Sequence, residues 1–248
     1  MTVRPSDDPW WSPDVAGAAE VIAEGVRDAP PGEVPGRLCE MAVRLLPVTG
    51  ASVSLRGEGV PVRLCTSGER AAYLAEIQTT LGDGPCVRAA ETGAPVLACD
   101  LTAGADAGRW PVFAQQATAV GVRAVYALPL GDDAVCVGTL DLYRDTPGRL
   151  TGSELRTARL VAAVMTTALT ALPLGEEYDV QGGEAWLSGL GGDHHEVHQA
   201  VGMIMAQLGV GADEALARLR ARAFARGHTA HTMAREVVAH RQTFDQDR

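Results

Sequence analysis

RAVYALPL (residues 123–130) and AVCVGTLDLY (residues 134–143), separated by Gly131-Asp132-Asp133, are the two segments that decide the fold of this 248-residue chain. Both are rich in the aliphatic, β-branched and aromatic residues that favour strands, and the Gly-Asp-Asp between them favours a tight turn. The pair therefore predicts a β-hairpin. Because the second segment is largely apolar, we expect it to lie in the centre of its sheet.

The segments around this hairpin predict helices that flank a small sheet. Apolar residues recur at helical spacing, or helix-favouring residues dominate, in 14–27, 33–46, 69–81, 110–120 and 151–172, whereas 51–56, 61–66 and 95–99 have the pattern of strands. Thr151 and Glu154 predict a capping box at the start of the last helix. Together these elements predict an α+β domain with a central antiparallel sheet. We expect the polar, proline-rich residues 1–13 to form a disordered tail.

Short motifs in this region resemble those of a known family. They are Gln78, Gly82-Asp83-Gly84-Pro85-Cys86, Asp100-Leu101, Arg109-Trp110-Pro111, Gly121-Val122-Arg123, Pro129-Leu130 and Gly138-Thr139-Leu140-Asp141-Leu142-Tyr143. Over residues 14–173 the set resembles a GAF domain, of the type that actinobacteria join to an ANTAR domain. The resemblance implies a sensory, GAF-like fold with a six-stranded antiparallel sheet and helices on one side, often dimerising through its terminal helices.

The C-terminal segment, residues 193–248, carries a second ordered set of motifs. They are HQAVGMIM (198–205), LARLR (216–220) and MAREVV (233–238), with Ala200, Gly202, Met205, Ala215, Leu219, Arg220, Ala234 and Val237 as the points of match. This set resembles the ANTAR domain, a small all-α three-helix bundle that binds RNA. The resemblance implies a transcription antitermination regulator that binds tandem hairpins in nascent transcripts as a homodimer.

Residues 174–192 separate the two regions and contain Gly175, Gly182, Gly183, Gly189, Gly191 and Gly192. Glycine disfavours helices, so this density predicts a flexible, non-helical linker. Many relatives are thought to join sensor and output by a rigid coiled coil. A flexible linker in place of a coiled coil argues against signalling in which a rigid helix transmits movement from the sensor to the output domain.

Charge and composition limit the classes of function. All 21 basic residues are arginines, and the net charge of -10 argues against an indiscriminate nucleic-acid coat. Residues 193–248 hold seven Arg and seven Asp or Glu, which leaves 14 basic and 24 acidic residues in the remainder. The acidity therefore lies in the first three quarters, and the neutral tail holds the capacity to bind nucleic acid.

The cysteines and the hydropathy pattern predict a soluble cytoplasmic protein. Cys39, Cys65, Cys86, Cys99 and Cys136 are odd in number and form no CxxC pair, and no signal peptide precedes them. The longest uncharged run, residues 160–175, is too short and too rich in Thr and Ala for a membrane span.

The distribution of histidines argues against an enzyme. A general base near neutral pH is most often His, and all six histidines lie beyond residue 192. The large domain therefore offers no Ser/His/Asp or Cys/His arrangement and no histidine ligand for haem or non-haem iron. There is also no phosphate-binding loop with a Lys. We expect no cofactor. Three possibilities stay open for the signal of the large domain: a small organic effector, a thiol-based redox signal, or no ligand at all.

Two residues are candidates for the sensor pocket. Cys86 follows Gly84-Pro85 and is predicted to begin a helix, whose dipole can lower the pKa of a thiol. The structural alternative, a small buried residue at a tight turn, is favoured. Trp110 is either a gate for a ligand or a cap on the core, and the second is favoured. His195-Glu196-Val197-His198 is one residue short of the HExxH motif. His194 and His198 have the i, i+4 spacing that could share a metal, but a solvated start of a helix is favoured, so no metal site is predicted.

The arginines of the tail are the stronger candidate site. On a helix over 213–226, Arg218, Arg222 and Arg226 lie along one face, and Arg220 lies between that face and the apolar one. Guanidinium groups stack on unpaired bases and bind phosphates bidentately, which suits recognition of hairpin loops. The candidate RNA-binding residues are Arg218, Arg220, Arg222, Arg226, His228, Arg235, Ala200 and Gly202. Many family members have Lys where this chain has Val201, so one phosphate contact is missing.

Two functional hypotheses follow. The first is an antitermination regulator in which a GAF sensor controls an ANTAR output domain. The second is a small-molecule or redox sensor whose C-terminal helices contact protein rather than RNA. In either case, the strongly apolar helix over 151–172 predicts a dimer interface, because its apolar surface exceeds one buried face.

Overall fold

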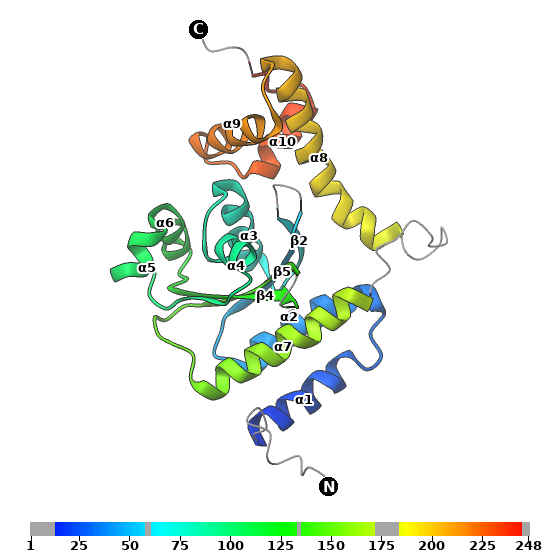
Figure 1. Cartoon of the computed structure of the whole chain (residues 1–248), viewed down its shortest axis with the longest axis vertical. Coiled ribbons are helices and arrows are strands. Elements are labelled where there is room, and N and C mark those ends of the chain that lie inside the picture. Colours follow the sequence, from blue (N-terminus) through cyan, green and yellow to red (C-terminus); the bar gives the residue numbers. More distant parts are fainter. Residues whose placement is uncertain (1–12, 58–60, 133–134, 172–183, 245–248) are drawn as a thin grey trace.

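A computed structural model of the chain describes residues 13–57, 61–132, 135–171 and 184–244. Its first part is an α+β domain, as predicted (Figure 1). Five strands of the described residues form one antiparallel sheet in the order β2-β1-β5-β4-β3. The strands are β1 (Gly50–Leu55), β2 (Val62–Thr66), β3 (Val96–Ala98), β4 (Ala124–Gly131) and β5 (Cys136–Arg144). The predicted hairpin is β4–β5, and β5 is central as expected. The resemblance implied six strands, one more than these residues form.

Alternation along β5 gives the sheet two different faces. Leu140 and Leu142 lie in an apolar cluster with Leu38 of α2 (Val34–Leu45) and Met165 of α7 (Gly152–Ala171). α1 (Pro13–Val26) packs on α2 and α7, and the short 3-10 helix η2 (Pro31–Glu33) lies between α1 and α2. The opposite face carries the polar residues of β5 and is covered by α3 (Glu69–Leu81) and α4 (Pro85–Thr92) (Figure 1).

Helix α7 begins with the predicted capping box. The Thr151 backbone N–H donates to Glu154 Oε2 at 2.6 Å, and the Glu154 N–H donates to Thr151 Oγ1 at 3.3 Å. These reciprocal bonds satisfy backbone donors that the first turn of a helix leaves without partners.

Two short helices were not among the elements predicted from periodicity. α4 begins at Pro85, whose fixed φ suits the first helical position. α5 (Gly104–Arg109) contains two glycines and precedes α6 (Pro111–Ala119). Its Asp106 carboxylate accepts hydrogen bonds from the backbone N–H of Cys99 (2.7 Å) and Asp100 (3.2 Å), so tertiary contacts support α5 where intrinsic propensity does not.

The C-terminal helices α8 (Glu184–Leu208), α9 (Ala212–Ala225) and α10 (Ala230–Val238) pack around their own apolar core. Val197, Val201 and Ile204 of α8 lie in one apolar cluster with Leu219 of α9 and Val237 of α10. Val201 is thus a core residue. A small helical unit of its own follows the α+β domain, as expected (Figure 1).

The prediction of a non-helical linker up to residue 192 is wrong for its second half, because α8 begins at Glu184 and runs through Gly189, Gly191 and Gly192. Each glycine costs a helix only about 1 kcal/mol relative to Ala, and a helix already anchored by packing over 196–208 extends over such a cost. Residues 174–183 lie outside the described residues.

Across the described residues, no single helix is long and apolar enough to cross a membrane; Glu196–Leu208 and Ala212–Ala225 pass that test of length and composition only as a pair, bent by 105°.

Candidate RNA-binding surface and sensor pocket

Helix α9 presents its arginines in the predicted arrangement. Arg218 and Arg226 are exposed, and Arg222 lies between them, partly exposed. Arg218 pairs with Glu214 one turn earlier, with 2.8 Å between Nη2 and Oε1. Arg222 donates to the Thr243 carbonyl at 2.6 Å and lies 3.9 Å from the centre of the Phe244 ring. These contacts hold a row of cations along α9 in which positive charge still faces solvent.

Arg220 turns away from this row and docks on the α+β domain. Its Nε donates to the Thr79 carbonyl at 3.0 Å, at the C-terminal end of α3. Burial lowers the pKa of Arg220, which nevertheless stays protonated near neutral pH. The last carbonyls of a helix have no partner within it, and the helix dipole favours a cation there. Arg220 thus caps α3 from 141 positions away.

A second contact joins the same two helix ends. The backbone N–H of Ala230, in the first turn of α10, donates to Thr80 Oγ1 at 2.8 Å, and both groups are buried. Thr80 Oγ1 in turn donates to the Glu76 carbonyl at 2.7 Å. The end of α3 and the start of α10 therefore satisfy groups that each helix would leave unbonded. Sequence reasoning missed Thr79 and Thr80, since no local pattern marks them.

The remaining tail candidates have different environments. Ala200 is fully buried in the core of the helical unit, whereas Gly202 is exposed on α8. His228 Nδ1 lies 3.8 Å from Glu236 Oε1, and Arg235 Nε lies 3.7 Å from Glu196 Oε2 on α8. The structure therefore brings Arg218, Arg222 and Arg226 together, assigns Arg220 to the domain contact and places Ala200 in the packing.

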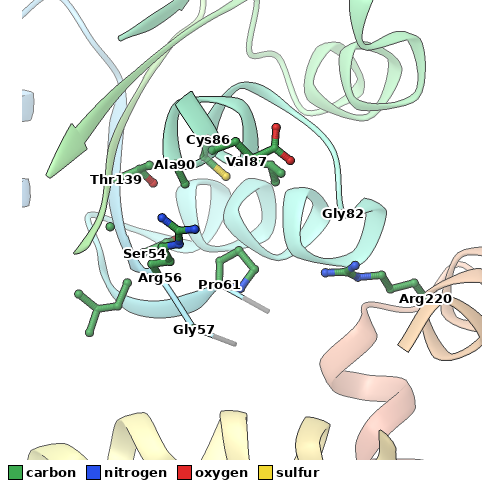
Figure 2. A pocket seen from close by; sticks show the side chains of 13 residues that line it. Ser54, Arg56, Gly57, Pro61, Gly82, Cys86, Val87, Ala90, Thr139 and Arg220 are labelled. Atoms are coloured by element: carbon green, nitrogen blue, oxygen red, sulfur yellow. The ribbon is translucent and has the colours of Figure 1, made fainter. Parts of the chain in front are cut away.

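A hollow of about 300 Å³ opens beside this domain contact (Figure 2). Ser54 and Arg56 come from β1 and the residue after it, Thr139 from β5, and Cys86 from α4. Arg220 of α9 reaches the rim of the hollow beside Gly82. A Cβ added to Gly82 would lie 2.8 Å from Arg220 Nη1. Gly82 ends α3 with φ +64°, so its lack of a side chain admits both the turn and the guanidinium.

Under α4 lies a buried polar cluster. Gln78 Oε1 accepts the Cys86 backbone N–H at 2.8 Å, and the Ser52 hydroxyl bonds to Tyr143 at 2.9 Å. Burial raises the pKa of Asp141 to about 8, although hydrogen bonds from Thr139 and Ser52 act to lower it. Gln78 Nε2 and Asp141 Oδ1 are buried without a hydrogen-bond partner among the described residues. Neither Gln78 nor Asp141 lines the hollow, and both are fully buried.

The two predicted sensor residues are separated. Cys86 lines the hollow but is only 3% exposed, and burial raises the pKa of its thiol well above the usual value, against the dipole effect considered from the sequence. Trp110 lies in a different apolar cluster with Phe113 and Leu101, with the Arg109 guanidinium 4.8 Å from its ring centre. No group of three or more His, Cys, Asp or Glu able to hold a metal ion occurs within the described parts of the chain.

Comparisons with known proteins agree with both halves of this arrangement. A family model of the GAF domain matches residues 36–169, more than half of the chain, and a model of the ANTAR domain matches residues 192–238. No curated protein matches the chain.

Solved structures similar to the chain include two GAF domains of phosphoenolpyruvate-protein phosphotransferases. The domain from Coxiella burnetii has a TM-score of 0.50 and 14% identity, over 63% of this chain and 93% of that chain. The domain from Acinetobacter has a TM-score of 0.51 and 10% identity, over 64% and 95%. At such identities the likeness shows the fold alone. The two family models establish that the chain belongs to the GAF–ANTAR family, regulators that join a GAF sensor domain to an RNA-binding ANTAR domain.

Proposed function

We propose that this protein is a transcription antitermination regulator whose ANTAR domain binds paired hairpins in nascent RNA and prevents a terminator from forming. The observation that carries the proposal is the coincidence of the ANTAR match with the helical unit whose α9 presents Arg218, Arg222 and Arg226. RNA loops expose bases and phosphates that such guanidinium groups bind by stacking and by bidentate hydrogen bonds. The activity requires binding only, so no reaction and no cofactor are proposed.

A gel shift with tandem-hairpin RNA tests the binding surface. We expect the double variant Arg218→Ala, Arg226→Ala to bind more weakly, and each lost phosphate contact to lower the slope of log affinity against log salt by about 0.7 to 0.9. Arg37→Ala is the matched control, because Arg37 also pairs with a Glu one helical turn away, Glu33, but lies on α2. If the control loses as much affinity as the double variant, the proposed surface is wrong.

Single-round transcription through a terminator preceded by tandem hairpins tests the output. We expect the protein to increase the fraction of full-length transcripts, and the Arg218→Ala, Arg226→Ala variant to lose that effect. Binding without any change in read-through would limit the function to RNA binding and contradict antitermination.

We also propose that the GAF domain controls the ANTAR domain through the docked contact. Arg220 is a point of match to the ANTAR motif, yet its guanidinium is held by the Thr79 carbonyl. RNA that needs Arg220 must therefore compete with the end of α3. An effector bound in the hollow beside Gly82 would act on the same contact, because Arg220 lines the rim of that hollow.

The second candidate is a small-molecule or redox sensor whose C-terminal helices contact protein. The observation in its favour is that α9 and α10 already pack on α3 through buried hydrogen bonds. The two candidates differ in the gel shift. If the full-length protein binds no structured RNA at low salt, with or without candidate effectors, the second replaces the first.

A further inference from the structure

Two cysteines that are 26 positions apart in the chain meet between α2 and β2. Cys39 Sγ and Cys65 Sγ lie 3.4 Å apart, and one thiol donates to the other. Cys39 is fully buried on the face of α2 that covers the sheet. Cys65 is partly exposed on β2, which lies at the edge of the sheet order. The contact is not visible in the sequence, where the two cysteines have no motif spacing.

We propose that Cys39 and Cys65 form a reversible thiol–disulfide site, oxidised by hydrogen peroxide or a related hydroperoxide. The Cys65 sulfur first attacks the peroxide, the O–O bond breaks, and Cys65 becomes a sulfenic acid as one water leaves. The Cys39 sulfur then attacks the Cys65 sulfur. The S–S bond forms as the S–O bond breaks, and the Cys39 proton leaves with the hydroxyl as a second water. Two thiols lose two electrons in total, and the peroxide gains them.

The order of the two steps follows from access. Cys65 is the member of the pair that solvent reaches, so it is the thiol that an oxidant in solution meets. Cys39 is sealed in the core, and both its hydrogen bond to Cys65 and its burial raise its pKa well above the usual value. Its burial makes Cys39 a poor first target, and its sulfur, 3.4 Å from Cys65 Sγ, lies in position to resolve a sulfenic acid on Cys65.

The other cysteines differ from this pair. Cys99 Sγ donates to the Leu97 carbonyl at 3.4 Å, and Cys136 Sγ donates to the Gly138 carbonyl at 3.2 Å. Cys86, in the first turn of α4, is 3% exposed. The S–S distance of a disulfide is about 2.0 Å. The sulfur atoms of Cys39 and Cys65 would therefore have to approach each other by little more than about 1 Å to form one.

The bond would connect α2 to β2, the edge strand that contacts a helix of the ANTAR domain. α2 packs under the sheet, and β2 contacts α8 of the ANTAR domain (Figure 1). A covalent link between Cys39 and Cys65 would fix the edge strand on which α8 rests. This site is independent of the docked Arg220 contact and of the proposed RNA binding.

The test uses the reduced full-length protein, treated with hydrogen peroxide, alkylated under denaturing conditions and digested for mass spectrometry. We expect one dominant cross-linked peptide pair, containing Cys39 and Cys65, that dithiothreitol abolishes.

In Cys39→Ser, dimedone should trap sulfenic acid on Cys65 about tenfold more than in the wild type, because the resolving thiol is absent. In Cys65→Ser, Cys39 should stay reduced. Cys136→Ser, which removes another partly exposed thiol, should leave the cross-link unchanged.

Three outcomes would overturn the proposal. One is sulfenic, sulfinic or sulfonic acid on wild-type Cys65 without the linked peptides. The second is a link from Cys65 to any cysteine other than Cys39, including a cysteine of a second chain. The third is oxidation of Cys39 in Cys65→Ser at the wild-type rate. Circular dichroism of each variant confirms that the thiols are compared in the same fold.

Discussion

Asp141 lies on the central strand β5, fully buried, with its Oδ2 3.5 Å from Thr139 Oγ1. Its pKa is raised from 3.8 to about 8, chiefly by burial. Between these values the unfolded chain carries a negative charge that the folded chain does not. The free energy of unfolding therefore falls as pH rises from about 4 to about 8, and the loss is complete above that range.

Asp141→Asn removes this titration and keeps an oxygen for the Thr139 hydroxyl. We expect the variant to raise Tm on the order of 5 °C at pH 8, and to change it much less at pH 4, where Asp141 is neutral in the folded chain and only about half ionised in the unfolded one. Thermal denaturation at the two pH values measures the effect. Asp145→Asn, an exposed residue just beyond β5, is the control and should show no such difference. Equal stabilisation at both pH values would contradict the account.

Gly84 explains why the Gly-Asp-Gly-Pro-Cys motif needs its second glycine. Its φ is +140°, and an added Cβ would lie 2.6 Å from Gln78 Oε1, the atom that accepts the Cys86 N–H. Gly84→Ala should therefore lower the free energy of unfolding by about 2–3 kcal/mol. Gly93→Ala shares a positive φ, +63°, but meets nothing within 4 Å, so it should cost less, about 1 kcal/mol. Chemical denaturation compares them, and equal losses would refute the steric explanation.

At the scale of elements, the sequence predicts most of the α+β domain because local patterns determine it. Strand alternation and turn residues predicted β4–β5, and Thr151 with Glu154 predicted the start of α7. α5 and the first half of α8 escaped prediction for one reason. Both contain glycines that lower intrinsic helix propensity, and contacts distant in sequence, such as Asp106 with Cys99, stabilise α5 despite them.

Helix α7 carries the prediction that the protein is a homodimer. Val161 and Met165 are buried against the sheet and α2, while Leu160 and Val164 are only partly buried, although α1 also packs on α7. We expect light scattering to give the dimer mass at tens of micromolar, and Val164→Glu to give the monomer mass because a charge would enter the interface. Thr167→Glu, on an exposed position of the same helix, is the control. A monomeric wild-type protein, or a dimeric Val164→Glu variant, would contradict this.

At the scale of the whole molecule, the site divides into a part that the sequence predicts and a part that it does not. The row Arg218, Arg222 and Arg226 follows from the helical period and lies on α9 and its C-cap. The docking of Arg220 on Thr79 depends on how two domains pack, and 141 positions separate the partners. No periodicity or motif encodes such a contact, so the sequence predicts only an RNA-binding role for Arg220.

The docked contact predicts how RNA affinity responds when it is weakened. Thr80→Val keeps the shape of the side chain but removes the hydroxyl that accepts the Ala230 N–H, leaving a buried donor without its partner. If only undocked molecules bind RNA fully, the apparent affinity scales with the undocked fraction, and we expect Thr80→Val to bind tandem-hairpin RNA about threefold to tenfold more tightly. Thr79→Val is the matched control, because its hydroxyl bonds within α3 and only its backbone carbonyl meets Arg220.

Arg220→Ala separates the two roles of that residue. It removes the docking contact as well as any contact with RNA, so a gain in affinity smaller than that of Thr80→Val shows that Arg220 also binds RNA. Fluorescence anisotropy with labelled tandem-hairpin RNA, at one fixed salt concentration, compares the variants with the wild type. If Thr80→Val and Thr79→Val bind with wild-type affinity while the Arg218→Ala, Arg226→Ala variant does not, the docked state already presents the RNA-binding surface. The contact between the domains would then position the ANTAR helices for RNA rather than withhold them, and control by the GAF domain would need another route.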